Sequence, residues 1–290
     1  MDWARLGSMV DLPLRRAVDG RGNGARRSLR TGVGFDIAGV RTYREGDEVR
    51  RIDWAATART GELHVRTTSA ESGVRTLVAL DLTTSMQFGT SAWKADVAAD
   101  LTYLIGHAAA RRGDQVAVAT SGTGTSPSAS GSRAQHLLTA AIEGASPSST
   151  DELAVQLIAG TRPSVPTGLV VIVTDLFTSL FTTHSDVVAR VGSRHELVVI
   201  VIHDPAELEL PEIDARFIFR FPGSTNTVTA ELGDRSLRDG YRREVQQHRL
   251  NIETVVHAAG GQLVEISTDG DPISAAIDAF SSLDGSGVRR

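Results

Sequence analysis

Two uninterrupted apolar runs constrain the fold of this 290-residue chain most strongly. Gly168–Val173 and Leu197–Ile202 carry no polar side chain, which is typical of strands buried on both faces. Such strands belong to parallel sheets that helices cover on each side. Both runs are far shorter than the roughly 20 residues of a membrane-spanning helix, and residues 1–20 lack the apolar core of a signal peptide. We therefore expect a soluble, cytoplasmic protein without direct membrane insertion.

Strand and helix patterns alternate along the chain after residue 75. Further strands are expected at Thr76–Leu80, Gln115–Ala119 and Gln262–Ile266, and long helices at Ala92–Arg112 and Ser236–Ala258. Gly- and Ser-rich residues 120–132 indicate a hairpin turn or mobile loop, and residues 216–231 a hairpin. This alternation predicts an α/β fold with a doubly wound, mostly parallel sheet.

The change of pattern near residue 75 helps to divide the chain into four parts. We expect a poorly ordered or helical tail over 1–27, an Arg-rich extension with short strands over 28–75, the α/β domain over 76–282 and a tail over 283–290. Residues 1–75 hold 14 Arg and 10 acidic residues. Because interspersed acids repel phosphate, we expect no nucleic-acid partner.

The composition removes several classes of function. The chain has no Cys, which excludes disulfide scaffolds, thiolate metal sites and cysteine nucleophiles. Lys94 is the only lysine and follows Trp93, so there is no Walker A loop. The sequence contains neither Gly-x-Ser-x-Gly nor His-Glu-x-x-His. Thr83 stands where a haloacid-dehalogenase-like phosphatase needs its second Asp. We therefore expect a non-enzymatic protein.

Acidic residues follow three of the expected strands, and one of them begins an oxygen-rich loop. Asp81, Asp175 and Asp204 come at or just after strand ends, where open α/β sheets bind ligands. Asp81 continues as Asp81-x-Thr83-x-Ser85, whose alternate side chains offer one carboxylate and two hydroxyls to a single point. Such hard oxygen ligands suit Mg²⁺ or Mn²⁺.

Two further residues complete a candidate metal site. Thr150 lies in a Ser-Ser-Thr-Asp turn before a helix, and Asp175 follows an apolar strand. Each also has a purely structural interpretation, because Thr and Asp are favoured caps at helix starts. The set Asp81, Thr83, Ser85, Thr150 and Asp175 therefore predicts either a metal site or a group of caps.

This order of residues resembles the metal-ion-dependent adhesion site of von Willebrand factor A domains. The usual pattern there is Asp-x-Ser-x-Ser, and Thr83 supplies an equivalent hydroxyl in place of the first Ser. The resemblance implies a von Willebrand factor A-like, Rossmann-type fold. It also implies a metal ion whose open coordination position accepts a carboxylate of a partner.

The segment before this site includes the run Val49-Arg-Arg-Ile-Asp-Trp54 and resembles the signature of a bacterial family, domain of unknown function 58. The resemblance spans about residue 28 to residue 282 and includes Gly32–Asp36, Val40–Asp47, Val49–Trp54, Ala58–Leu63, Arg112–Val116, Asp204–Pro211 and Ser267–Asp269. Members are similar to proteins encoded beside MoxR-type AAA+ ATPases. The resemblance therefore implies an adaptor for such an ATPase in assembling or activating a client protein.

The Arg-rich extension mixes both charges with aromatic rings. It is interpreted either as a salt-bridge network that ties the extension to the α/β domain or as a partner-binding face, since Arg, Tyr and Trp make hot spots. The candidate partner-binding residues are Tyr43, Arg44, Arg50, Arg51, Asp53, Trp54 and Arg59. Acidic Glu207–Pro211 is expected to be an exposed loop, serving either as a contact or as a plain connection.

Taken together, these patterns predict a divalent-metal-dependent protein-binding module. Two alternatives stay open: a structural scaffold in which the acids only cap helices, and a metal-dependent hydrolase. A scaffold would show no change in melting temperature when Mg²⁺ or Mn²⁺ is added.

Overall fold

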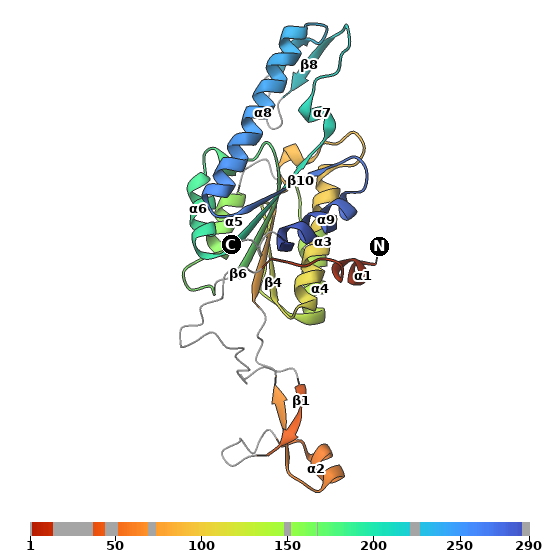
Figure 1. Cartoon of the computed structure of the whole chain (residues 1–290), viewed down its shortest axis with the longest axis vertical. Coiled ribbons are helices and arrows are strands. Elements are labelled where there is room, and N and C mark those ends of the chain that lie inside the picture. The colour runs from red at the N-terminus through yellow and green to blue at the C-terminus, as the bar shows by residue number, and fades with distance from the viewer. Residues whose placement is uncertain are drawn as a thin grey trace. The chain divides into compact units, whose positions relative to one another are not determined.

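The computed structural model describes residues 2–13, 37–43, 52–68, 74–147, 152–166, 168–220 and 227–285. The chain divides into two compact units. The larger unit comprises Met1–Val18 and Val74–Arg290, and the smaller comprises Asp19–Gly73. The larger unit carries a central sheet with helices on both sides (Figure 1).

The sheet of the larger unit has six strands within the described residues, in the order β10-β7-β6-β3-β4-β5. They are β3 (Arg75–Leu80), β4 (Gln115–Thr120), β5 (Gly124–Thr125), β6 (Gly168–Asp175), β7 (Glu196–His203) and β10 (Gln262–Ser267). Only β5 is antiparallel to its neighbour among these strands. The strand order reverses between β3 and β6, and open α/β sheets bind ligands at such a switch point.

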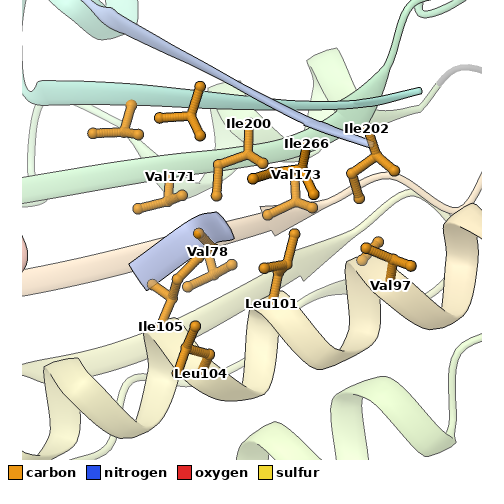
Figure 2. Packing of buried hydrophobic residues seen from close by; sticks show 14 of the residues in the cluster. Val78, Val97, Leu101, Leu104, Ile105, Val171, Val173, Ile200, Ile202 and Ile266 are labelled. Atoms are coloured by element: carbon orange, nitrogen blue, oxygen red, sulfur yellow. The ribbon is translucent and has the colours of Figure 1, made fainter. Parts of the chain in front are cut away.

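Helices pack on both faces of the sheet because β3, β6 and β7 direct apolar side chains alternately to one face and to the other. The helices are α3 (Lys94–Arg111), α4 (Gly131–Glu143), α5 (Leu153–Gly160), α6 (Ser185–Arg194), α8 (Arg235–Ala258) and α9 (Pro272–Gly285). Val78 and Leu80 join α3 and α9 in one buried cluster, whereas Leu77 and Ala79 join α5, α6 and α8 in another. Figure 2 shows Leu101 of α3 among the side chains of the first cluster.

The N-terminal segment belongs to the larger unit. Helix α1 (Trp3–Gly7) packs against α3, where Trp3 stacks on Tyr103 with ring centroids 5.6 Å apart. Val10 is buried in the same cluster as α3, and the Arg112 guanidinium donates to the Leu12 carbonyl at 2.8 Å. Residues 2–13, expected as part of a separate tail, therefore help to cover one face of the sheet.

A projecting arm leaves the carboxyl edge of the sheet after β7. It comprises α7 (Pro205–Leu208), the antiparallel hairpin β8 (Arg216–Arg220) and β9 (Thr227–Glu231), and the first half of α8. The buried residues of the 24-residue α8 are Ile252 and Val256, both near its C-terminal end. The N-terminal half of α8 extends past the sheet (Figure 1).

The smaller unit contains a strand pair and a short helix within its described residues. Strands β1 (Ile37–Thr42) and β2 (His64–Thr68) are antiparallel, and α2 (Trp54–Thr60) precedes β2. Helix α2 begins at the N-cap Asp53 and ends at Gly61, which has a φ of 77°. A positive φ favours glycine at a helix C-terminus.

The predicted α/β class and the mostly parallel sheet are confirmed. Residues 120–132 were predicted as a hairpin turn or a mobile loop, and they contain the turn and second strand of the antiparallel β4–β5 pair. Helix α4 begins at Gly131, before the predicted end of this segment. Helix α6 was not predicted, although Val187, Val188 and Val191 have helical spacing and are buried. Among the described residues, no helix is both long and apolar enough to cross a bilayer.

Candidate metal and partner-binding site

The first part of the site is the turn that follows β3. Asp81 is fully buried, and its backbone N–H donates to the Val173 carbonyl of β6 at 2.8 Å. Asp81 Oδ1 accepts the Thr83 N–H at 2.9 Å, and Oδ2 accepts the Thr174 hydroxyl at 2.6 Å. The carboxylate is thus fixed at the switch point by neutral donors from its own turn and the neighbouring strand.

Burial and a neighbouring charge change the acidity of this carboxyl group. Burial raises the pKa of Asp81 most, and the negative charge of Asp175 raises it further. Hydrogen bonds from Thr174 and Thr83 oppose the rise, and the resulting pKa is about 6. The Asp81 carboxylate therefore lies where an additional cation would be favourable.

The two hydroxyls of the Asp-x-Thr-x-Ser loop lie side by side. Thr83 Oγ1 and Ser85 Oγ are 3.1 Å apart, with Ser85 in the short 3-10 turn η2 (Thr84–Met86). Ser121, at the end of β4, holds this loop by accepting the Leu82 N–H at 2.8 Å. Two ligands on adjacent corners of an octahedral Mg²⁺ site are about 3 Å apart, so the spacing of these hydroxyls suits that ion.

Asp175 supplies the second carboxylate from the end of β6. Its side chain is fully buried, and Oδ1 accepts the Phe177 N–H at 2.9 Å. Oδ2 accepts the Lys94 ammonium at 2.7 Å. Asp175 therefore carries both a turn-stabilising hydrogen bond and an ion pair.

The Lys94 ammonium also pairs with Glu207 of α7. Lys94 is fully buried, and its Nζ lies 2.5 Å from Glu207 Oε1. Burial raises the pKa of the Glu207 carboxyl, while the Lys94 charge opposes the rise. The expectation of an exposed loop over Glu207–Pro211 is thus wrong for Glu207. Its side chain closes the capping box of α7 by accepting the Asp204 N–H at 2.9 Å.

Asp204, the third strand-end acid, has a different environment. Its carboxylate accepts the backbone N–H and hydroxyl of Thr90, the hydroxyl of Thr268 and the N–H of Ala206. Burial alone would raise its pKa, but these donors together lower the pKa to about 2. Asp204 is therefore a structural junction between β7, the loop before α3 and the residues after β10.

Exposed aromatic rings come from the loops that carry the site. Phe88, Trp93 and Phe177 have exposed fractions of 42%, 53% and 57%. The Lys94 Nζ lies 6.0 Å from the ring centroid of Phe88 and 5.2 Å from that of Phe177, within range of cation–π attraction. Phe88 and Phe177 lie near the Lys94 ammonium, and all three rings present apolar surface to solvent.

The structure brings four of the five candidate metal residues to the carboxyl edge of β3 and β6. Thr150 lies outside the described residues. The residues present fit a divalent ion, because two buried carboxylates and a hydroxyl pair offer oxygen ligands. Among the described residues, no group of three or more carboxylate or imidazole side chains forms a metal cluster. The fit therefore depends on hydroxyls as well as carboxylates.

Lys94, Ser121 and Thr174 were not predicted as part of the site, and Glu207 was predicted only as part of an exposed loop. Lys94 had a detectable signal, since it is the chain's only lysine and lies near the start of the helix after Asp-x-Thr-x-Ser. The hydrogen bonds of Ser121 and Thr174 depend on strand order, which local patterns do not specify.

The candidate partner-binding residues belong to the smaller unit, and the structure describes four of them. Asp53 accepts the Ala56 N–H at 3.0 Å as the N-cap of α2, which gives it a structural role. Trp54 has an exposed fraction of 65%, Arg59 lies in the last turn of α2, and the Tyr43 N–H donates to the Leu63 carbonyl. Arg44, Arg50 and Arg51 lie outside the described residues.

The mostly parallel sheet, covered by helices on both faces, is a Rossmann-type, von Willebrand factor A-like α/β fold. Residues 39–251 match the model of a protein family described as "Protein of unknown function DUF58". The chain belongs to that family.

Similar chains occur in mycobacteria. "Uncharacterized protein Rv1480" of Mycobacterium tuberculosis and "Uncharacterized protein Mb1516" of Mycobacterium bovis are each 30% identical over 271 residues, covering 90% of this chain and 84% of theirs. Among solved structures, BatB from Bacteroides thetaiotaomicron matches 73% of this chain and 100% of its own. An aerotolerance-related membrane protein from Bacteroides fragilis matches 72% and 98%. Both structures have 15% identity and a TM-score of 0.42.

Proposed function

We propose that this chain is a non-enzymatic protein-binding module whose association with partners depends on a divalent metal ion. One observation carries the proposal: Asp81, Thr83, Ser85 and Asp175 gather at the switch point of a parallel sheet. Mg²⁺ or Mn²⁺, when bound, supplies a positive centre with a coordination position for a partner's carboxylate. Thr83 and Ser85 contribute neutral oxygens, while Asp81 and Asp175 contribute charge.

The aromatic rim supports a protein partner. Phe88, Trp93 and Phe177 belong to the same loops as the candidate ligands, and large aromatic side chains carry much of the binding energy at interfaces. A partner whose carboxylate reaches the metal would cover these rings at the same time. Binding would thereby combine a directional metal contact with burial of apolar surface.

The partner we propose is a MoxR-type AAA+ ATPase, with the chain acting as its adaptor during assembly or activation of a client protein. Support for this identity comes from family resemblance, whereas support for a carboxylate-bearing partner comes from the site. The Arg-rich extension is a second candidate contact, with Trp54 exposed on α2.

A structural scaffold is the second candidate function, and particular contacts favour it. Asp81 and Asp175 each accept a backbone N–H from the turn that follows them. Asp175 is also neutralised in part by Lys94. In this alternative, the carboxylates hold the loops and no metal is needed.

Affinity purification of the tagged chain from its native lysate, in Mg²⁺ and in EDTA, separates the two candidates. An ATPase recovered only in Mg²⁺ supports the metal-dependent adaptor. Recovery in both buffers keeps the partner but makes the metal incidental, and recovery in neither favours the scaffold.

Asp81→Asn is the informative variant, because Asn keeps an acceptor for the Thr83 N–H while removing the charge. The matched control is Asp186→Asn, which removes the same charge from an exposed position on α6. We expect Mg²⁺-dependent recovery to disappear in Asp81→Asn and to persist in Asp186→Asn.

A further inference from the structure

The ammonium group of Lys94 is a fixed internal cation beside the candidate metal residues. The side chain has no exposed surface, and its Nζ lies 2.7 Å from Asp175 Oδ2 and 2.5 Å from Glu207 Oε1. Lysine is almost never fully buried unless it is paired. The chain has 30 basic residues, yet only this one is a lysine.

Asp175 is shared between this cation and the candidate metal site. Oδ2 accepts Lys94 and Oδ1 accepts the Phe177 N–H, so both oxygens are engaged. The oxygens of Asp81, by contrast, accept hydrogen bonds from the neutral groups of Thr83 and Thr174. The carboxylate of β6 is therefore the one whose negative charge is offset from within the chain.

A divalent ion near Asp175 would meet this ammonium at close range. Like charges a few ångströms apart repel strongly where water is excluded, because the interaction is screened less there than in bulk solvent. Any oxygen of Asp175 that turned toward the ion would also weaken its contact with Lys94. The lysine and the metal ion are thus competitors for one carboxylate.

We propose that Lys94 lowers the divalent-metal affinity of this site, because its ammonium group competes with the metal ion for the Asp175 carboxylate. This inference rests on the metal site of the proposed function and names the residue that tunes it. Lys94 is a positioning residue here, since it acts on the ion through Asp175. A metal affinity lowered in this way leaves room for a partner's carboxylate to complete binding.

The test uses a pair of substitutions that leaves the net charge unchanged. Lys94→Met combined with Glu207→Gln removes the ammonium together with one of its two carboxylate partners, so Asp175 is the one charged group of the triplet that remains. Because the total charge is that of the wild type, any change in metal affinity reports the release of Asp175 rather than a general electrostatic effect. Mn²⁺ binding is measured directly by calorimetry and by the loss of its free-ion paramagnetic resonance signal.

The chain offers a matched control at the opposite edge of the sheet. Arg112 pairs with the buried Asp114 at 2.5 Å, just before β4 begins. Arg112→Met combined with Asp114→Asn also leaves the net charge unchanged and removes an ion pair that has a buried carboxylate and a partly exposed guanidinium. Asp81→Asn added to the Lys94 and Glu207 pair shows whether the binding measured belongs to the candidate site.

We expect the Lys94→Met/Glu207→Gln chain to bind Mn²⁺ at least about tenfold more tightly than the wild type, and the control pair to match the wild type. Asp81→Asn should abolish the gain. Equal or weaker binding in the Lys94 variant, with a wild type that does bind, overturns this inference alone. Binding by the variant but not by the wild type supports the inference and overturns the proposed metal dependence. Binding by neither overturns both.

Discussion

Asp81 and Asp204 are both fully buried carboxyl groups at the carboxyl edge of one parallel sheet, yet their acidities shift in opposite directions. Burial and the charge of Asp175 raise the pKa of Asp81 to about 6. Hydrogen bonds from Thr268, Thr90 and Ala206 overcome burial and lower the pKa of Asp204 to about 2. The comparison teaches that position at the sheet edge does not decide the acidity of a buried carboxyl group, whereas the donors and charges around it do.

The largest expected effect concerns the well-satisfied acid. Asp204→Ala removes the cap of α7 and leaves Thr90 and Thr268 without their acceptor. We expect the free energy of unfolding to fall by about 4 kcal/mol, since several buried donors lose their partner. Chemical denaturation measures it. A loss below about 1 kcal/mol would show that Asp204 is not the junction described above.

The pH dependence of stability should separate the two acids. The pKa of Asp81 is higher in the folded chain than in the unfolded chain. Its contribution to the free energy of unfolding is therefore fully present below about pH 4 and is lost as the pH rises through about 6. The depressed pKa of Asp204 gives stability that is present above about pH 4 and is lost as the pH falls through about 2.

Comparison of the wild type with Asp81→Asn in EDTA isolates the first of these contributions. The wild type should lose about 3 kcal/mol relative to this variant between about pH 3.5 and pH 7. Denaturant unfolding across that range measures the difference. A difference independent of pH would mean that Asp81 does not titrate as its surroundings indicate.

Addition of Mg²⁺ should act through Asp81 and not through Asp204. At 100 times the dissociation constant, a ligand that binds only the folded chain stabilises it by about 2.7 kcal/mol. For a chain of this size, we expect the melting temperature to rise by about 4–5 °C. The rise should vanish in Asp81→Asn and persist in Asp186→Asn. A rise that persists in Asp81→Asn would place metal binding elsewhere.

The smallest expected effect on stability comes from Thr83→Val. The Thr83 hydroxyl is partly buried and contacts Ser85, so its loss should change the free energy of unfolding by less than about 0.5 kcal/mol. Metal affinity should nevertheless fall about tenfold, because one oxygen ligand is lost. Calorimetric titration with Mn²⁺ checks this. Unchanged affinity would remove Thr83 from the site.

Much of the fold follows from local patterns. The apolar runs of β6 and β7 and the helical spacing in α3 specify buried strands and a covering helix, and these elements lie within a few residues of their predicted bounds. The fit is good because burial on both faces leaves a strong hydrophobic signal. Helix α7 is too short to leave a periodic signal, and α6 was unassigned despite its apolar spacing.

The site was only partly predictable for a related reason. Asp81, Thr83 and Ser85 are close in sequence, so their spacing alone places them on one turn. The pairing of Lys94 with Asp175 and Glu207 joins residues 81 and 113 positions apart. Such contacts depend on which strands are neighbours and on how the arm begins, and no local pattern contains that information.

The single lysine also makes this chain suited to site-specific chemical labelling. Amine-directed reagents find one side-chain target in this sequence, and that target is buried beside Phe88 and Phe177 and paired with two carboxylates. Acylation of Lys94 therefore requires the ion pair to open and the ammonium to lose a proton. The rate at which Lys94 is labelled, measured by mass spectrometry, therefore reports how often the loops at the switch point open, and it needs no engineered probe.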